Sequence, residues 1–312
     1  MFVGDDSCSQ FPNPSSKCSL RWWFDTVKGG LEKHDTRLSL FKQSPFSFLL
    51  HLSSFRFIGA LFHLLLVRYK GDLIFEIRGT RLQFTEMDFA LITGLKTGEL
   101  TIPEKRPISS TLMDKYFREY PVIKKHLLDV FNKLVDTNKH EDVVKVALLM
   151  CVEYFVRGTE SKTMCNMDYM YLVDSIEDFY SYPWGSLAYN TMSQGVAAAV
   201  MASGAVRYNV YGCVFPLQIW AVERLPALQE CVISFVPSQI PRFIQYRGWK
   251  GWRYNKIYAI FESEATILIK NLEPTLREWE MDAVRLLRDS FQVIETQELS
   301  DEGNENDDEG LG

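Results

Sequence analysis

The chain has 312 residues, of which 46% are hydrophobic and 24% are charged, and its formal net charge at pH 7 is −6. This composition is typical of a soluble globular protein with a substantial core. The longest apolar run, residues 58–67, is too short to cross a membrane, because a spanning helix needs about twenty residues. No membrane partner is expected. The first residues lack an apolar stretch of signal-peptide length, so an intracellular protein is expected.

The negative charge is concentrated at the end of the chain. Residues 291–312 hold eight acidic side chains and no basic one, whereas residues 1–290 are nearly neutral. This stretch has too few apolar side chains to offset the entropy lost on ordering. We therefore predict a disordered acidic tail at residues 291–312.

Cysteine and histidine spacing argues against a metal centre. The six cysteines contain no Cys-x-x-Cys pair, so reduced and buried thiols are expected rather than a disulfide scaffold or a zinc ribbon. The five histidines all lie at or before His140, and no two have the i, i+4 spacing of paired ligands on one helix face. We expect no metal site and no cofactor.

The first predicted elements are a helix, a hairpin and a second helix. Residues 55–70 have a broad apolar face and end before Gly71, which predicts a helix. Two β-prone runs at 73–77 and 81–84 flank a glycine and predict a β-hairpin. Thr85, with an acid three residues later, predicts the N-cap of a short helix that Gly94 closes.

The rest of the chain is predicted to be mostly helical. Residues 231–261 instead contain short β-prone runs broken by proline and glycine. The fold class is therefore mainly α: a single helical domain at residues 20–290 with a small β-hairpin or minor sheet component, preceded by a flexible N-terminus at residues 1–19. The remaining predicted helices are residues 111–119, 121–134, 141–157, 174–180, 187–202, 215–224 and 274–294.

Several short motifs, in this order and spacing, carry a resemblance to a known family. They are Phe89-Ala90-Leu91-Ile92-Thr93-Gly94-Leu95, Tyr182-Pro183-Trp184-Gly185, Phe215-Pro216-Leu217-Gln218-Ile219-Trp220 and Pro241-Arg242-Phe243. Together they resemble the plant-specific domain of unknown function found upstream of SUMO-protease-like cysteine peptidase domains in Mutator-type transposon-derived proteins. The resemblance implies a plant source, a nuclear setting and a transposon-derived history, and it implies no established activity.

The chain lacks the residues that such a peptidase uses. Catalysis there needs a His, an Asp, a Gln and a nucleophilic Cys in that order. Val173-Asp174-Ser175 resembles the acid element, but the nearest upstream histidine is His140 and neither Cys213 nor Cys231 has the Asp-Cys-Gly setting of the nucleophile. We expect no catalytic residues and no enzyme. The predicted role is a non-catalytic accessory or protein-interaction domain with a protein partner, and a fragment of a peptidase protein is the second alternative.

Residues 242–256 are the best candidate contact segment, because they interleave five bases with five aromatic rings and contain no acid. Bases attract phosphate and rings stack on unpaired nucleobases, so nucleic acid is the alternative partner. The favoured interpretation is a hairpin whose tryptophans pack against helices while the bases are solvated. The candidate contact residues are Arg242, Tyr246, Arg247, Trp249, Lys250, Trp252 and Arg253.

Tyr182, Pro183, Trp184 and Gly185 are predicted to form a structural corner rather than a ligand clamp. Pro183 disfavours helical geometry at the residue before it and has no N–H to donate. Gly185 is expected to allow the reversal and Ser186 to cap the following helix. Trp184 is expected to bury its ring and to find one partner for its indole N–H.

A second aromatic cluster lies near the N-terminus. Arg21-Trp22-Trp23-Phe24 can serve as docking anchors for a protein partner, although packing onto the core is the favoured interpretation.

Overall fold

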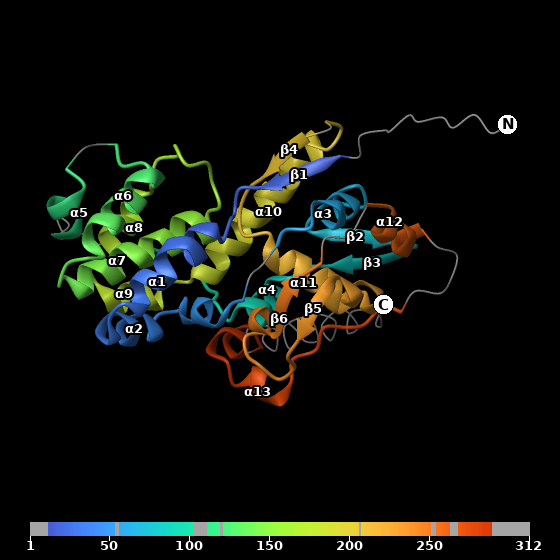
Figure 1. Ribbon diagram of the computed structural model, residues 1–312. Coiled ribbons are helices and arrows are strands. Elements are labelled where there is room, and N and C mark those ends of the chain that lie inside the picture. Colours follow the sequence, from blue (N-terminus) through green and yellow to red (C-terminus); the bar gives the residue numbers. More distant parts are fainter. Residues whose placement is uncertain are drawn as a thin grey trace, which may run out of the picture.

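A computed structural model describes residues 12–53, 56–102, 111–118, 121–205, 207–250, 254–262 and 268–288. Within them the fold is mainly α, as predicted, and the strands form three separate two-stranded sheets (Figure 1). The acidic tail predicted at residues 291–312 lies outside the described residues, as do Trp252 and Arg253.

The α-helices and the shorter helical turns alternate with the strands along the chain. The α-helices are α1 (Lys28–Glu32), α2 (Asp35–Lys42), α3 (Gly59–Leu66), α4 (Glu86–Thr93), α5 (Thr111–Tyr116), α6 (Lys124–Leu134), α7 (His140–Met150), α8 (Met167–Leu172), α9 (Ile176–Ser181), α10 (Trp184–Ala202), α11 (Phe215–Arg224), α12 (Tyr254–Glu262) and α13 (Leu276–Trp279). Two π-helical turns, η1 (Trp23–Val27) and η3 (Cys151–Val156), and three 3₁₀ turns, η2 (Ser47–His51), η4 (Pro226–Cys231) and η5 (Arg242–Gln245), complete the helical part. The strands are β1 (Asn13–Ser16), β2 (Ile74–Ile77), β3 (Thr80–Gln83), β4 (Arg207–Val210), β5 (Val232–Phe235) and β6 (Tyr246–Trp249).

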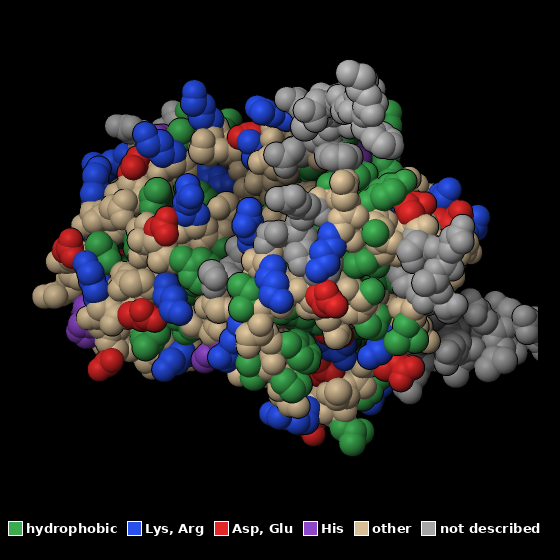
Figure 2. All heavy atoms as spheres, turned by 45° about the vertical axis from the view of Figure 1, so that its right-hand side comes forward, with side chains coloured by type: hydrophobic (Ala, Val, Ile, Leu, Met, Phe, Trp, Pro, Cys, Tyr) green, Lys and Arg blue, Asp and Glu red, His purple; other side chains and the backbone are tan. Residues whose placement is uncertain are grey.

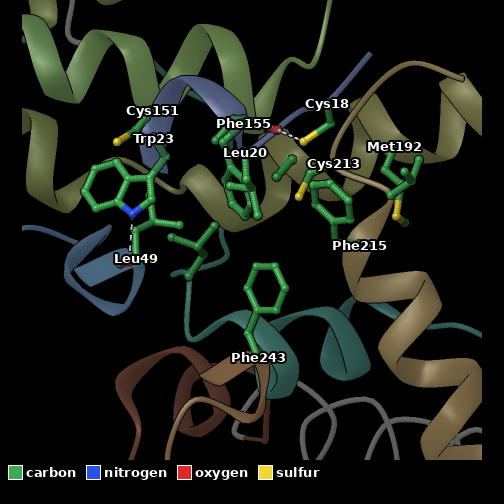
Figure 3. Packing of buried hydrophobic residues seen from close by; sticks show 14 of the residues in the cluster. Cys18, Leu20, Trp23, Leu49, Cys151, Phe155, Met192, Cys213, Phe215 and Phe243 are labelled. Atoms are coloured by element: carbon green, nitrogen blue, oxygen red, sulfur yellow. Dashed lines mark hydrogen bonds between the residues drawn. The ribbon is translucent and has the colours of Figure 1, made fainter. Parts of the chain in front are cut away.

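The long helix α10 connects two groups of elements. In Figure 1, α1, α2 and α5 to α9 lie on one side, and α3, α4, α11 to α13 and the hairpins lie on the other. α10 packs against α3, α4, β4 and η3, so it contacts both groups. One continuous hydrophobic core runs through the molecule and joins Trp23, Phe155, Phe215 and Phe243, which come from four distant parts of the sequence (Figure 3).

The hairpin and the following helix form as predicted. β2 and β3 pair antiparallel with Ile77 opposite Thr80, and the two turn residues Arg78 and Gly79 both have positive φ, at 51° and 76°. Two-residue hairpin loops favour this conformation because its twist matches that of the strands. α4 then begins with the capping box of Thr85 and Asp88 and ends at Gly94 in the left-handed region.

The helix predicted at residues 141–157 is present but changes its winding. α7 ends at Met150 and the chain continues as the π-helical turn η3, in which Glu153 is buried. The Glu153 carboxylate accepts hydrogen bonds from Arg157 Nη1 at 2.6 Å and from the Asn166 backbone N–H at 3.0 Å. These bonds compensate for the loss of solvation, since a buried charge without partners is very costly.

Three predicted elements differ from those found. The helix predicted at 55–70 is limited to α3, because the chain after Leu66 turns back and Tyr69 bridges Phe75 of β2. The helix predicted at 274–294 breaks after α13, and residues 282–288 form a separate helical stretch. The β-prone signal predicted up to residue 261 is wrong beyond 254, where α12 buries Ile257 and Phe261 at helical spacing against α3.

β1 lies inside the segment predicted as a flexible N-terminus, residues 1–19. It pairs in parallel with β4, with Ser16 opposite Val210, and the ladder continues through the Lys17 N–H, which donates to Val210 O at 2.8 Å. The partner strand is almost two hundred residues away in sequence, so no local pattern indicated this pairing.

Two glycines let the connection after β4 lie directly on the backbone of α10. A Cβ atom on Gly195 would lie 2.2 Å from Tyr211 O, and one on Gly212, whose φ is +79°, would lie 2.7 Å from Met192 Cα. Because the contacted atoms belong to the backbone, no side-chain rotation can relieve such a clash. Only glycine fits at these positions.

We expect Gly195→Ala to lower the free energy of unfolding by about 1–3 kcal/mol, the usual cost of overpacking. Chemical denaturation followed by circular dichroism measures this change. Gly204→Ala is the matched control, because a Cβ there meets no atom within 4 Å. Equal stability of the two variants would contradict the close approach of α10 to Tyr211.

Arg37 forms a clamp between the N-terminal helices and the α6–α7 connection. Its buried guanidinium donates to Gly30 O, Val135 O and Thr137 O at 3.1, 2.8 and 2.6 Å, and its Nε donates to His140 Nδ1 at 3.2 Å. The His140 ring stacks on His34, with ring centroids 3.8 Å apart. His140 Nδ1 is therefore an acceptor, and this arrangement requires a neutral imidazole.

Because the clamp requires a neutral His140, we expect the stability of the protein to fall in mild acid. Partial burial, followed by the nearby His34 and Arg37, lowers the pKa of His140 below its ordinary value. The folded state then binds fewer protons than the unfolded state. The contribution of neutral His140 to the free energy of unfolding is therefore complete above about pH 6.5, and it is lost as pH falls through the lowered pKa. Thermal unfolding between pH 7.5 and pH 5 should show a smaller pH dependence for His140→Gln than for the wild type.

The exposed His51 provides the control for this measurement. His51→Gln should retain the wild-type pH dependence. Buried His63 also has a lowered pKa, caused by desolvation and by Arg68, so a residual dependence should remain in His140→Gln. If thermal unfolding of His140→Gln and His51→Gln had the same pH dependence, His140 would not contribute to the loss of stability in acid.

Candidate functional site

A surface cavity of about 550 Å³ lies where β5, η5, α11 and α13 meet, and we call it the Arg242 pocket. These elements all lie between residues 215 and 279, and turns of the chain between them bring them together. Its lining residues are Glu223, Phe235, Pro237, Ser238, Ile240, Arg242, Gln245, Thr275, Leu276, Arg277 and Glu278.

A buried ionic network forms one wall of the pocket. The Arg242 guanidinium donates to both carboxylate oxygens of Glu278, from Nε at 2.7 Å and from Nη2 at 2.9 Å, and Nη2 also donates to Glu273 O at 2.6 Å. Glu223 Oε2 lies 3.5 Å from Arg242 Nη1, and its other oxygen accepts from the Tyr246 hydroxyl at 2.5 Å. The two-pronged contact with Glu278 is the geometry in which arginine binds carboxylate most strongly.

The electrostatics of the network keep its ion pair charged. Burial by itself raises the pKa of Glu278, but the hydrogen bonds from Arg242 and Thr275 and the charge of Arg242 lower it below the ordinary value. Burial and the neighbouring Glu223 raise the pKa of Tyr246, so this hydroxyl stays protonated and donates. Arg242 is fully engaged within the protein, so we assign it the role of holding η5 against α13.

The mouth of the pocket is apolar and unusually exposed. Phe235 is 47% exposed and Leu276 is 87% exposed, and the neighbouring Ile233 is 63% exposed. Ile233, Ser234 and Phe235 follow one another in β5, so this strand is exposed on both of its faces. In Figure 2, hydrophobic side chains gather beside basic ones at the lower part of the molecule, where Figure 1 places β5, β6 and α13.

The structure separates the candidate contact residues into two groups. Arg242, Tyr246 and Trp249 are buried, and the ring of Trp249 stacks on that of Tyr246 at 5.7 Å. Arg247 and Lys250 are exposed on or just after β6. The described rings therefore belong to the core, which removes them as stacking surfaces for nucleobases, and two bases remain on the surface.

Glu223, Glu278, Phe235 and Leu276 were not singled out from the sequence. Glu278 has one local signal, the Thr275 N-cap with an acid three residues later, which the structure uses as a capping box. The other residues become neighbours only through tertiary packing, and the sequence holds no pattern that indicates it.

The Tyr182–Gly185 segment turns the chain between α9 and α10. Trp184 is fully buried and its indole N–H donates to Phe179 O at 2.7 Å. α10 begins at Trp184, earlier than predicted, so Ser186 lies inside the helix and does not cap it. The hydroxyl of Ser186 instead accepts from the Gly98 N–H at 2.9 Å and donates to Glu86.

Gly185 has a different role from the predicted one. It is a helical residue of α10, and its N–H donates to Lys96 O at 2.8 Å. A Cβ there would lie 2.5 Å from Leu95 O. The glycine is required by this close approach and not by a reversal of the chain.

The N-terminal tryptophans pack inside the molecule. Trp23 is fully buried and its indole N–H donates to Leu49 O at 2.9 Å, and Trp22 is 6% exposed. Neither ring is available as a surface anchor in this conformation.

The thiols considered as nucleophiles are also buried. Burial raises the pKa of Cys213 well above its ordinary value and raises that of Cys231 to about 12. A thiol with a raised pKa is scarcely ionised at neutral pH, so neither cysteine is activated in the way that a peptidase nucleophile requires. Within the described residues, no group of three or more His, Cys, Asp or Glu side chains is placed to hold a metal ion, and no helix is both long and apolar enough to span a membrane.

We expect Glu278→Ala to lower the free energy of unfolding by about 3 kcal/mol, because it leaves the buried Arg242 without its main partner. Chemical denaturation measures this value. Arg285→Ala removes an ion pair with Asp282 whose two side chains are more than half exposed, and it should leave stability nearly unchanged. A Glu278→Ala protein as stable as Arg285→Ala would show that the network does not hold η5 against α13.

Comparison with known proteins identifies one family. Residues 61–195 match the sequence model of a family described as a domain of unknown function, DUF1985. No curated protein and no solved structure matches the chain. The matched stretch runs from α3 into α10 and includes the hairpin, the Gly94 motif and the Tyr182–Gly185 corner, while the Arg242 pocket lies outside it. Residues 61–195, less than half of the chain, are therefore similar to this family of unknown function.

Proposed function

We propose that the chain is a non-catalytic protein-interaction domain that binds an extended peptide segment of a partner protein at the Arg242 pocket. The observation that carries this proposal is the exposed apolar mouth of the pocket, formed by Phe235 and Leu276 beside the edge of β5. Exposed apolar side chains around a cavity are typical of interaction sites.

The strand β5 offers the main-chain part of such a site. Among the described strands β5 pairs only with β6, so one edge of β5 carries no described strand. An exposed strand edge is a template for another extended segment, which gains main-chain hydrogen bonds along it. Because Ile233 to Phe235 are exposed on both faces, an added strand can reach this edge without displacing the core.

The side chains around the pocket favour a peptide with an apolar anchor and acidic neighbours. Phe235 and Leu276 can enclose one apolar side chain, which contributes about 1.5–3 kcal/mol when it is fully buried. Arg277 lines the pocket, and Arg247 and Lys250 are exposed on the adjacent strand region. These bases complement carboxylates on either side of the anchor.

The biological setting of the proposal comes from the resemblance of the chain to a plant domain that accompanies SUMO-protease-like peptidases in transposon-derived proteins. An accessory domain of such a protein positions a partner and needs no catalytic residues. The burial of Cys213 and Cys231 supports a non-catalytic role. On this basis we propose an accessory domain of a transposon-derived plant protein that acts in the nucleus.

Selection of random displayed peptides on the full chain tests the proposal. We expect enriched peptides with an apolar residue flanked by acidic ones, and we expect Phe235→Asp and Leu276→Asp each to weaken their binding at least about tenfold, equivalent to about 1.4 kcal/mol. Fluorescence anisotropy of labelled peptides measures the affinity. Met201→Asp is the matched control, since Met201 is 89% exposed on α10 and should not affect binding.

Two outcomes would overturn the peptide proposal. One is that no peptide is enriched, or that enriched peptides bind Phe235→Asp as tightly as the wild type. The other is that single-stranded oligonucleotides bind more tightly than any peptide and lose affinity in the Arg247→Glu/Lys250→Glu variant. The second outcome would assign the exposed bases to nucleic-acid binding instead.

A further inference from the structure

Two cysteines far apart in sequence meet at one end of the β1–β4 sheet. Cys18 follows β1 by two residues and Cys213 follows β4 by three. Because the strands are parallel and Ser16 lies opposite Val210, the residues after both strands emerge at the same end of the sheet. Figure 3 shows the two sulfur atoms close together, in the core beside Phe155 and Phe215.

The two thiols are joined by a short hydrogen-bond chain. Cys18 Sγ donates to Phe155 O at 3.4 Å. The side chains of Cys213 and Cys18 are hydrogen-bonded to each other. Since a thiol has one hydrogen and that of Cys18 is directed at Phe155, the sulfur of Cys18 accepts from Cys213. The two side chains are therefore neighbours in the core, as Figure 3 shows.

A surface cavity of about 630 Å³ is lined by Cys18, the first residue of the pair. Its wall includes Cys18 and Phe215, together with the serine hydroxyls of β1 and the side chains of Arg21 and Arg56. A molecule of the size of hydrogen peroxide is small enough to enter such a space. Cys213 lies behind Cys18 and is fully buried, so a reagent in the cavity meets Cys18 first.

We propose that Cys18 and Cys213 form an oxidation site at which hydrogen peroxide generates a disulfide between the N-terminal strand and the β4–α11 connection. The Cys18 thiolate attacks one peroxide oxygen, the O–O bond breaks, and Cys18 becomes a sulfenic acid while hydroxide leaves and takes up the thiol proton as water. The Cys213 sulfur then attacks the Cys18 sulfur, and the sulfenic hydroxyl leaves with the Cys213 proton as a second water. Two thiols lose two electrons in total, and one peroxide molecule accepts them.

The disulfide would fix a part of the fold that is otherwise weakly held. A sheet of two short strands has little stability of its own, and β1 is held to the molecule through β4 and α3. A covalent bond between residues 18 and 213 restricts opening of this sheet. Oxidation should therefore protect the N-terminal segment from local unfolding.

Peptide mapping after peroxide treatment tests the proposal on the full chain. Cys8→Ala is introduced in every sample, which leaves the five buried cysteines. We expect peroxide to lower the thiol count after acid quenching and unfolding from five to three, and a tryptic peptide pair joined through residues 18 and 213 to appear. Tryptic cleavage after Lys17 and Arg21 in the folded protein should become slower after oxidation and return to its original rate with dithiothreitol.

Three variants and one internal marker make the result decisive. Cys18→Ala and Cys213→Ala should each abolish the loss of two thiols, whereas Cys165→Ala should retain it. Sulfoxide formation at Met201, which is 89% exposed, shows that the peroxide was active. If Met201 is oxidised while the folded protein keeps all five thiols, or if the 18–213 link forms only in urea, the proposal is wrong.

Discussion

The architecture depends on the close contact between the backbone of α10 and two other segments. At Gly185 the helix touches the carbonyl of Leu95, and at Gly195 it touches that of Tyr211, with Gly212 completing the second contact. Helices that carry side chains at their contacts pack about 8–10 Å apart, so only glycine allows this proximity. The contacts hold the segment after α4 and the connection after β4 directly on the backbone of α10. The Cys18–Cys213 pair lies close to this contact, since Cys213 directly follows Gly212.

The Arg242 network stabilises the wall of the Arg242 pocket. It joins η5, α11, β6 and α13, which share no local sequence signal, and it does so with charged groups rather than with apolar packing. A buried network of this kind destabilises the fold unless every partner is present, because each buried charge has lost its hydration. The exposed mouth of the pocket therefore rests on a rigid wall. This wall supports the exposed apolar side chains at the mouth of the proposed peptide site.

The sequence predicted correctly those elements whose structure is determined by residues close together in the chain. The hairpin around Gly79, the capped helix α4 and the proline-initiated helix α11 all follow from residues within one or two turns of each other. The predictions were less accurate where a distant segment decides the outcome: β1 depends on β4, and α3 ends early because Tyr69 pairs with β2. The candidate site shows the same division. The segment 242–256 was identified from its composition, but the burial of its rings depends on partners elsewhere in the chain.

The hydrophobic core extends beyond the residues that match the family model. Trp23 and Phe243 lie outside the matched residues 61–195, yet they pack into the same cluster as Phe155, which lies inside them. A polypeptide cut at the borders of the match would expose the core on two sides and leave Gly94 without its neighbour Pro241. The unit of sequence similarity is therefore smaller than the unit of folding. The described residues before 61 and after 195 contribute side chains to this core, so deleting them would alter the interior itself.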